Sequence, residues 1–348
     1  MFRKIKVGYY PLSKDLTHPG DRRRLKFWAD NRGVKLHVNP DSKMDLVFVS
    51  EKSDFFSIAK SHSNTPLVYD LIDGYLESKS LTSDALRASA KFLTGEVSKF
   101  SLRYTKYVAR ECELATKVIC STVEQSLRIK EFNNDVSVIL DSHEEFPMIE
   151  PELIGKKNFH LLWEGMPYTL DAIRELKLAF EEIEDLGMNV VSDREFFRIL
   201  GRYFPMSTEK LIGRCLNGHE SRISLTSWTQ ENLVRSAQDS SIAVLPIDMQ
   251  DPIQVYKAEN RLLIMWRLGL PCLVSPTLAY SRVMNSIGEN LICNSTVEWL
   301  NKITLLRDSD GHRYEIVEKG QQYLRDFHSS EILLNKWDSL IEATLDEF

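Results

Sequence analysis

The chain has 348 residues, of which 43% are hydrophobic and 27% are charged, and this composition excludes a wholly disordered protein. A chain of this length predicts two domains, because single domains commonly hold about 100–200 residues. The formal net charge of −6, from 44 Lys and Arg against 50 Asp and Glu, argues against a nucleic-acid-binding protein, whose domains are usually basic.

Two absences bear on location and metal binding. No apolar run approaches the ~20 residues that span a bilayer, and the N-terminus lacks the apolar stretch of a secretory signal, so we expect a cytoplasmic protein. The five cysteines are widely spaced without a Cys-x-x-Cys motif, and the eight histidines form no His-x-x-x-His pair. We therefore expect no metal site.

Short β-branched runs alternate with helical stretches in the first half of the chain. The expected strands are 4–10, 34–38, 45–49, 66–71, 117–121 and 136–140, and the expected helices are 21–31, 54–60, 81–112 and 123–132. Several of these strands are apolar throughout, as parallel strands are when helices cover both faces of their sheet. The alternation predicts a doubly wound α/β domain over residues 1–145.

Prolines, a glycine and charged residues then interrupt the alternation, and we place a linker at 146–158. The pattern restarts in the second half. The expected strands are 159–163, 188–191, 222–225, 241–247, 271–275 and 290–293, and the expected helices are 170–185, 193–200, 230–238, 257–268, 296–307 and 313–327. A second Rossmann-like domain over 159–328 follows, and a C-terminal helix at 329–348 is expected to pack back on the first domain.

Open parallel sheets bind ligands beyond the carboxyl ends of their strands, and two such domains facing each other leave a cleft. Asp70 and Asp73 lie at the end of an apolar strand, and Asp21 at the start of a helix. A carboxylate such as Asp21 or Asp73 at this edge acts as a general base or binds hydroxyl groups, or it caps a turn or helix.

A cluster of positive charge opens the sequence, since residues 1–35 hold ten basic and three acidic side chains. Arg22, Arg23 and Arg24 follow Asp21 in what reads as a first helical turn, where positive charge opposes the helix dipole. We therefore expect Arg22 and Arg23 to contact an acceptor or another anion from outside. An anionic membrane surface is one candidate partner, and an exposed basic turn without a ligand is the alternative.

The segment 241–275 reads as a strand, a loop, a helix capped by Gly269, and a strand. Lys257, Asn260 and Arg261 are spaced to share one face of the first helical turns, where two cations and free N–H groups favour an anion. A solvated face is the alternative.

Three further residues follow strands of the second half. Gly165 allows close approach of a ligand to the backbone. Ser192 reads as a hydrogen-bonding residue or an N-cap, and Trp228 as a stacking residue or part of the core. The sequence has no G-x-G-x-x-G, no G-x-x-x-x-G-K-[ST] and no G-x-S-x-G, which leaves dinucleotide, P-loop and α/β-hydrolase chemistry without support.

The run IAVLPIDMQDPIQVYKAENRLLIMWRLGLPCLVS resembles the donor-binding unit of GT-B glycosyltransferases of the 1/4-like group, which build bacterial surface polysaccharides. In these proteins a strand ending in Pro leads to a K-x-x-N-[RK] helix and a G-x-P-[VC] strand. LVYDLIDGYLE, TKVICST and YLRDFHSSEILLNKWDSLI also look similar to the family. The two glutamates that many members carry eight positions apart correspond here to Tyr256 and Ile264.

The resemblance implies a hexosyl- or pentosyltransferase that needs neither metal nor cofactor. A nucleotide-diphosphate sugar would bind mainly to the second domain, and a glycan or lipid-linked acceptor to the first. The implied donor contacts are Gly165, Ser192, Trp228, Tyr256, Lys257, Asn260 and Arg261. Asp21 or Asp73 would be the catalytic base if the transfer inverts.

Two alternatives remain open from the sequence. One is an isomerase similar to nucleotide-sugar 2-epimerases, which share the two-domain architecture. The other is a binding subunit of GT-B fold without catalytic activity.

Overall fold

The structure is a computed structural model that describes residues 2, 5–95, 97–98, 101–151, 159–196 and 206–347. It divides into two units: unit 1 comprises Met1–Ser142, Gln250–Ala258 and His328–Phe348, and unit 2 comprises His143–Met249 and Glu259–Phe327. The first division falls before the predicted linker, of which 152–158 lie outside the described residues. Residues 250–258, which we assigned to the second domain from the sequence, cluster with unit 1 instead.

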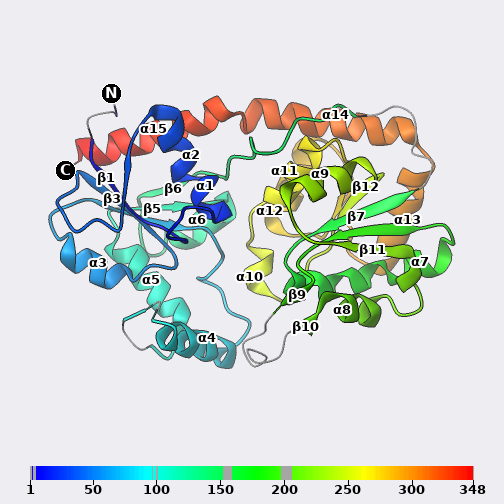
Figure 1. Cartoon of the computed structure of the whole chain (residues 1–348), viewed down its shortest axis with the longest axis horizontal. Helices are drawn as coiled ribbons and strands as arrows, with labels where there is room; N and C mark the ends of the chain where they lie inside the picture. The colour runs from blue at the N-terminus through cyan, green and yellow to red at the C-terminus, as the bar shows by residue number, and fades with distance from the viewer. Residues whose placement is uncertain are drawn as a thin grey trace. The chain divides into compact units, whose positions relative to one another are not determined.

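Unit 1 is built on a six-stranded sheet of order β2-β1-β3-β4-β5-β6, in which all neighbouring pairs are parallel (Figure 1). Its strands are β1 (Val7–Tyr10), β2 (Leu36–Val38), β3 (Leu46–Ser50), β4 (Leu67–Leu71), β5 (Lys117–Cys120) and β6 (Val136–Val138). Each lies within a strand expected from the sequence or ends one residue beyond it, so the predicted parallel α/β domain is confirmed.

The apolar strands are explained by burial on both faces of the sheet. In β3, Val47 and Val49 belong to one hydrophobic cluster and Leu46 and Phe48 to another, because successive side chains of a strand point to opposite faces. Helices α3 (Phe55–Ser61), α5 (Tyr104–Leu114) and α6 (Val123–Ile129) contribute to the first cluster. Helices α2 (Leu25–Arg32) and α15 (Ser330–Asp346) contribute to the second.

Two helices expected in unit 1 are divided in the structure. The expected helix 81–112 is wrong as a single element, because α4 (Leu81–Leu93) ends before Gly95, which adopts a left-handed φ of +75°. Helix α5 starts only at Tyr104. The expected helix 21–31 is interrupted between α1 (Pro19–Arg22) and α2, where Arg24 leaves the helical conformation. Unit 1 also contains α10 (Pro252–Val255).

Unit 2 contains a five-stranded parallel sheet of order β11-β8-β7-β12-β13. Its strands are β7 (His160–Glu164), β8 (Gly187–Val191), β11 (Ile223–Thr226), β12 (Ile242–Leu245) and β13 (Cys272–Val274), with a separate antiparallel pair of β9 (Glu195–Phe196) and β10 (Met206–Ser207). Its α-helices are α7 (Lys177–Glu182), α8 (Thr208–Cys215), α9 (Gln230–Gln238), α11 (Asn260–Arg267), α12 (Leu278–Ser286), α13 (Thr296–Arg307) and α14 (Asp310–Phe327).

The second Rossmann-like domain is confirmed, with differences in its elements. The expected helix 193–200 is wrong where it is described, since β9 occupies Glu195–Phe196, and 197–200 lie outside the described residues. The expected strand 290–293 is reduced to a single bridge between Val274 and Ile292. A 3₁₀ helix at Pro167–Leu176 precedes α7 where one α-helix was expected, and α8 and α12 were not anticipated.

The C-terminal helix α15 packs within unit 1. The Trp337 ring is fully buried, and its centroid lies 6.0 Å from that of Phe48 on β3. Asp338 accepts hydrogen bonds from Trp28 Nε1 at 2.8 Å and from Arg32 Nη2 at 2.5 Å, so α15 is tied to α2. The last segment of the chain is thereby part of the first unit's core.

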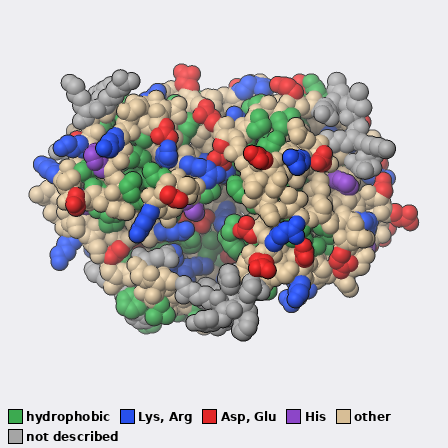
Figure 2. Space-filling view, viewed as in Figure 1, with side chains coloured by type: hydrophobic (Ala, Val, Ile, Leu, Met, Phe, Trp, Pro, Cys, Tyr) green, Lys and Arg blue, Asp and Glu red, His purple; other side chains and the backbone are tan. Residues whose placement is uncertain are grey.

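The surface of the molecule carries both signs of charge. Figure 2 shows Lys and Arg side chains interspersed with Asp and Glu over the visible face. Among the described residues, no helix combines the length and the apolarity that crossing a bilayer requires.

Candidate functional site

Four residues singled out in the sequence meet at the carboxyl ends of the strands in unit 2. Gly165 follows β7, and Ser192 follows β8. Trp228 lies in the loop after β11, where its backbone N–H donates to the Ser192 carbonyl at 3.2 Å. Arg261 comes from the first turn of α11. Together with Glu164, these residues form what we call the unit 2 strand-end network.

Glu164, the last residue of β7, connects this network. Its carboxylate accepts a hydrogen bond from Trp228 Nε1 at 2.8 Å, and its carbonyl accepts one from Arg261 Nη1, also at 2.8 Å. The indole and the guanidinium are therefore both oriented by one residue. Glu164 was not among the residues predicted from the sequence, although a charged residue that ends an apolar strand is a signal that could have identified it.

Gly165 makes room for the guanidinium. A Cβ at this position would lie 3.0 Å from Arg261 Nη1 and 3.1 Å from the Trp163 ring, closer than nearly all side chains tolerate. We expected a ligand to approach the backbone of Gly165 closely, and in the structure the Arg261 guanidinium does so.

Ser192 is not placed to meet a ligand. It is fully buried, and its hydroxyl donates a hydrogen bond to the Gly165 carbonyl at 2.7 Å. The prediction that Ser192 contacts the donor is corrected accordingly, since its hydroxyl fixes the peptide of Gly165. Trp228, in contrast, is partly exposed.

The start of α11 combines two features that favour negative charge. Asn260 is its first residue, and Arg261 lies in its first turn, where the positive end of the helix dipole adds to the guanidinium charge. The Asn260 side-chain oxygen lies 3.1 Å from His143 Nε2. Arg282 pairs with the preceding Glu259 at 2.9 Å.

Lys257 and Tyr256 lie elsewhere than predicted. The expected helix over 257–268 starts only at Asn260, and Lys257 lies in the turn after α10, within unit 1. Lys257 therefore does not share a helix face with Asn260 and Arg261. Its ammonium lies 3.8 Å from a carboxylate oxygen of Asp73. Tyr256 packs against Gly74, since a Cβ added to Gly74 would lie 2.9 Å from the Tyr256 Cβ.

Asp21 has no free position for a substrate. The carboxylate is fully buried and accepts hydrogen bonds from the Tyr9 hydroxyl at 2.6 Å, from the N–H of Leu12 at 2.8 Å, and from the N–H and hydroxyl of Ser13 at 2.9 Å each. A general base needs an accessible lone pair on its oxygen. The prediction of Asp21 as a catalytic base is therefore corrected: Asp21 shapes the loop after β1.

The basic turn after Asp21 is also reinterpreted. Arg24 is fully buried and forms a two-pronged pair with Asp70, with Nη2 at 2.6 Å from one carboxylate oxygen and Nε at 2.9 Å from the other. Asp141 adds a second contact at 3.2 Å. The negative charge that faces Arg24 therefore comes from Asp70 and Asp141 within the fold. Arg22 donates to the Thr17 carbonyl at 2.6 Å, and Arg23 is largely buried.

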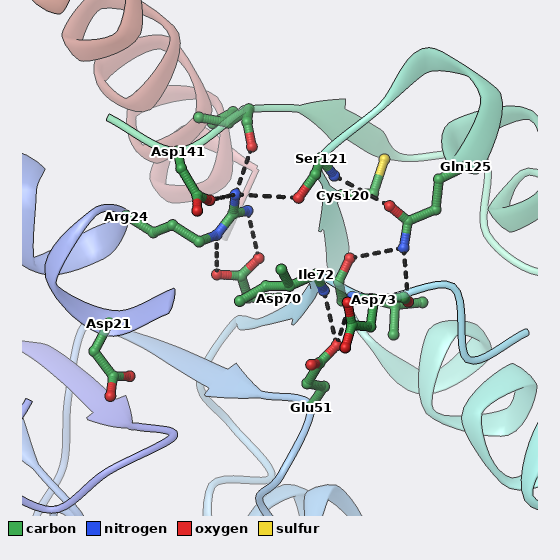
Figure 3. Close-up of polar contacts among 12 residues, drawn as sticks. Asp21, Arg24, Glu51, Asp70, Ile72, Asp73, Cys120, Ser121, Gln125 and Asp141 are labelled. Carbon is green, nitrogen blue, oxygen red and sulfur yellow. Dashed lines mark hydrogen bonds and ion pairs between the residues drawn. The ribbon is translucent and has the colours of Figure 1, made fainter. Parts of the chain in front are cut away.

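These contacts belong to a second group of polar side chains, the unit 1 strand-end network, which comprises Arg24, Glu51, Asp70, Asp73, Gln125 and Asp141 (Figure 3). Burial alone lowers the pKa of the Arg24 guanidinium. The charges of Asp70 and Asp141 and their hydrogen bonds raise the pKa by more than burial lowers it, so Arg24 stays charged. Figure 3 shows Asp21 apart from these contacts.

Glu51 and Gln125 were not singled out in the sequence, although Glu51 directly follows the apolar strand β3. Glu51 is 8% exposed, and its burial, followed by the neighbouring charge of Asp73, raises its pKa to about 8. Asp73 retains a partly exposed side chain at the same edge. In the described ranges, no group of three or more His, Cys, Asp or Glu side chains is placed to hold a metal ion.

No protein-family model matches the chain, and no curated protein matches it in sequence. Solved structures do match its fold. HepE from Anabaena, in complex with UDP-glucose, superimposes with a TM-score of 0.65 at 11% identity, covering 99% of this chain and 100% of HepE. WaaG, a glycosyltransferase of lipopolysaccharide biosynthesis, superimposes with a TM-score of 0.57 at 13% identity, covering 96% and 98%.

TarM gives a TM-score of 0.61 at 14% identity and covers 86% of this chain, which spans just over half of TarM, 55% of its length. Each of these matches extends over both units of the chain. The chain therefore has the two-domain GT-B fold, built from two Rossmann-like domains.

Proposed function

We propose that the protein is a glycosyltransferase that moves a hexosyl or pentosyl group from a nucleotide-diphosphate sugar to a glycan or lipid-linked acceptor in surface polysaccharide synthesis. The observation that carries the proposal is the unit 2 strand-end network, in which Glu164 orients both Trp228 and Arg261. The fold supports it, and HepE was solved with UDP and with UDP-glucose, and the pneumococcal O-GlcNAc transferase GtfA with UDP and GlcNAc. UDP is therefore the first donor fragment to test.

The network suits the two ends of a nucleoside diphosphate. The Trp228 indole offers a flat apolar surface for a base, and its N–H is already taken by Glu164, which fixes the ring. Arg261 and the N-terminus of α11 offer positive charge and N–H donors to the diphosphate. Negative charge grows on the leaving diphosphate during transfer, so the same groups favour the transition state.

On the acceptor side, Asp73 is the carboxylate that remains accessible once Asp21 is excluded. In an inverting transfer, Asp73 takes the proton of the acceptor hydroxyl while the oxygen of that hydroxyl forms a bond to the anomeric carbon of the donor sugar. The bond from that carbon to the diphosphate breaks, and the nucleoside diphosphate leaves with the electron pair. In a retaining transfer, Asp73 binds the hydroxyl without acting as base.

The donor site is tested by measuring the affinities of UDP and of inorganic pyrophosphate by titration calorimetry. Arg261→Ala is expected to weaken both ligands about 10- to 100-fold, because a hydrogen bond to a charged group is worth about 1.5–3 kcal/mol. Trp228→Ala is expected to weaken UDP but not pyrophosphate, because stacking on a base is lost and no phosphate contact is changed.

Arg307→Ala is the matched control, since Arg307 is also an arginine of unit 2 but forms a surface pair with Asp185 at 3.3 Å. Unchanged UDP affinity in Arg261→Ala would exclude the proposed diphosphate site. Turnover of a UDP-sugar into its epimer without acceptor would instead identify an isomerase.

A further inference from the structure

The loop that follows β4 is held by buried side chains from two neighbouring elements. Glu51, directly after β3, accepts hydrogen bonds from the N–H groups of Ile72 and Asp73, both at 2.9 Å to the same carboxylate oxygen (Figure 3). The peptide that carries Asp73 is thereby fixed at its amide end.

Gln125 fixes the other side of the same loop. This residue of α6 is 2% exposed, and its Nε2 donates to the carbonyls of Leu71 and Asp73, both at 3.0 Å. Its own side-chain oxygen accepts the N–H of Ser121 at 3.2 Å, which orients the amide. The N–H and the carbonyl of Asp73 are thus both bound by side chains that solvent barely reaches.

The Asp73 side chain is treated differently from its backbone. It remains 31% exposed, and the Lys257 ammonium lies 3.8 Å from one of its carboxylate oxygens, a distance typical of a loose, solvated ion pair. The arrangement combines a backbone held by side-chain hydrogen bonds with an accessible carboxylate. Such a combination is what a group that must meet a ligand at a set position requires.

Glu51 binds the two N–H groups through a buried carboxyl that lies beside the carboxylates of Asp73 and Asp70. Burial and the neighbouring negative charges disfavour its ionised form. Burial raises its pKa to about 8, first through desolvation and then through the charge of Asp73. Unfavourable environments of this kind gather at functional sites.

We propose that Glu51 and Gln125 are positioning residues that hold the Asp73 carboxylate to accept a hydrogen bond from the acceptor hydroxyl. The inference rests on the proposed function, because it assumes that unit 1 meets the acceptor. It assigns no proton transfer to Glu51 or Gln125, which act only through Asp73.

The test measures UDP release from UDP-sugars with a panel of alkyl glycosides as acceptors, and with water alone. Glu51→Ala and Gln125→Ala are each expected to lower kcat/KM for the acceptor at least 10-fold, with the affinity for UDP unchanged. Glu51→Gln keeps an oxygen that accepts both N–H groups and is expected to stay within about threefold of the parent. In an Asp73→Asn background, Glu51→Ala is expected to cause no further loss.

Glu111→Ala is the matched control. Glu111 is another buried carboxyl of unit 1, 2% exposed, and its described hydrogen bond comes from the Tyr69 hydroxyl at 2.8 Å and not from residues 72 and 73. Its truncation is expected to lower the melting temperature without changing the acceptor kcat/KM. Amide hydrogen exchange at residues 72 and 73 is expected to quicken in Glu51→Ala and not in Glu111→Ala.

Three results would overturn the positioning role while leaving the glycosyltransferase standing. These are an active Glu51→Ala with parental acceptor kinetics, an equal loss from Glu51→Ala with and without Asp73→Asn, and amide exchange at 72 and 73 that Glu51→Ala does not alter. A parent that binds UDP but releases none from any UDP-sugar would overturn both proposals and leave a binding subunit. A parent that does not bind UDP would overturn the proposed function itself.

Discussion

Arg24 illustrates how burial decides the role of a charged residue. It is one of three consecutive arginines, yet its guanidinium has no exposure and pairs with Asp70 and Asp141. Removing one partner of such a pair leaves a buried charge uncompensated, which typically costs about 3–5 kcal/mol. Arg24 therefore holds the ends of β4 and β6 together instead of presenting charge to a ligand or a membrane.

Glu51 provides a prediction about pH at the scale of one residue. Its pKa is raised in the fold from the ordinary value of 4.5 to about 8, by burial and by Asp73 and Asp70. The stability that the neutral carboxyl contributes is complete below about pH 4.5 and is lost as the pH rises through 8. Glu51→Gln cannot ionise and does not lose it.

We therefore expect the free energy of unfolding of the parent to fall relative to that of Glu51→Gln by at least about 1 kcal/mol between pH 5 and pH 8. Urea denaturation at several pH values measures the difference. Glu111 and Asp70, whose pKa values burial also raises, are present in both proteins, so their desolvation contributes to both curves. Parallel stability curves would contradict the buried state of Glu51.

At the scale of elements, α15 shows how the end of the chain completes a core formed by its beginning. Leu333, Trp337 and Ile341 of α15 share a cluster with Trp28 of α2 and Phe48 of β3. The spacing of four residues places these three side chains on one face of the helix. Asp338, beside Trp337, forms the polar contacts of the same interface.

Asp338→Ala is expected to destabilise the protein by about 1–3 kcal/mol, because the Trp28 indole N–H and the Arg32 guanidinium each lose an acceptor. The midpoint of urea denaturation, monitored by tryptophan fluorescence, measures the effect. Glu331→Ala, an exposed position in the first turn of the same helix, is expected to change stability by less than about 0.5 kcal/mol. Equal effects of the two substitutions would show that the Asp338 contacts add nothing.

At the scale of the whole molecule, the two units divide the proposed work. Unit 2 carries the network that orients Trp228 and Arg261, and unit 1 carries the loop that presents Asp73. In the proposed transfer, Arg261 and the N-terminus of α11 supply the positive charge for the diphosphate. On this ground we also propose that the transfer needs no metal ion.

Transfer from a UDP-sugar is accordingly expected to proceed at an unchanged rate in the presence of EDTA. Release of UDP, measured with and without the chelator, checks this. An apparent loss of activity that added Mg²⁺ or Mn²⁺ restores would contradict the proposal and assign the diphosphate charge to a metal ion.

The sequence was sufficient to predict the two parallel α/β domains, because the signals involved are local. An apolar run such as the one that forms β3 indicates a strand buried on both faces wherever it lies, and the ranges expected for α9 and α13 coincide with the helices observed. Gly269, expected as a helix cap, has a left-handed φ of +78°. The same pattern also predicted that Trp228, Arg261 and Asp73 lie near the carboxyl ends of the strands.

Only the tertiary structure decided which charged residues are available to a ligand. Asp21 and Asp73 are both candidate bases in the sequence, but Asp21 accepts four hydrogen bonds in the interior and Asp73 stays accessible. Glu51, Gln125 and Glu164 gain their roles from partners in loops that follow other strands of the same sheet, 21, 52 and 64 residues away. Burial and hydrogen bonding depend on which strands adjoin, and that pairing is a property of the folded chain that no local pattern contains.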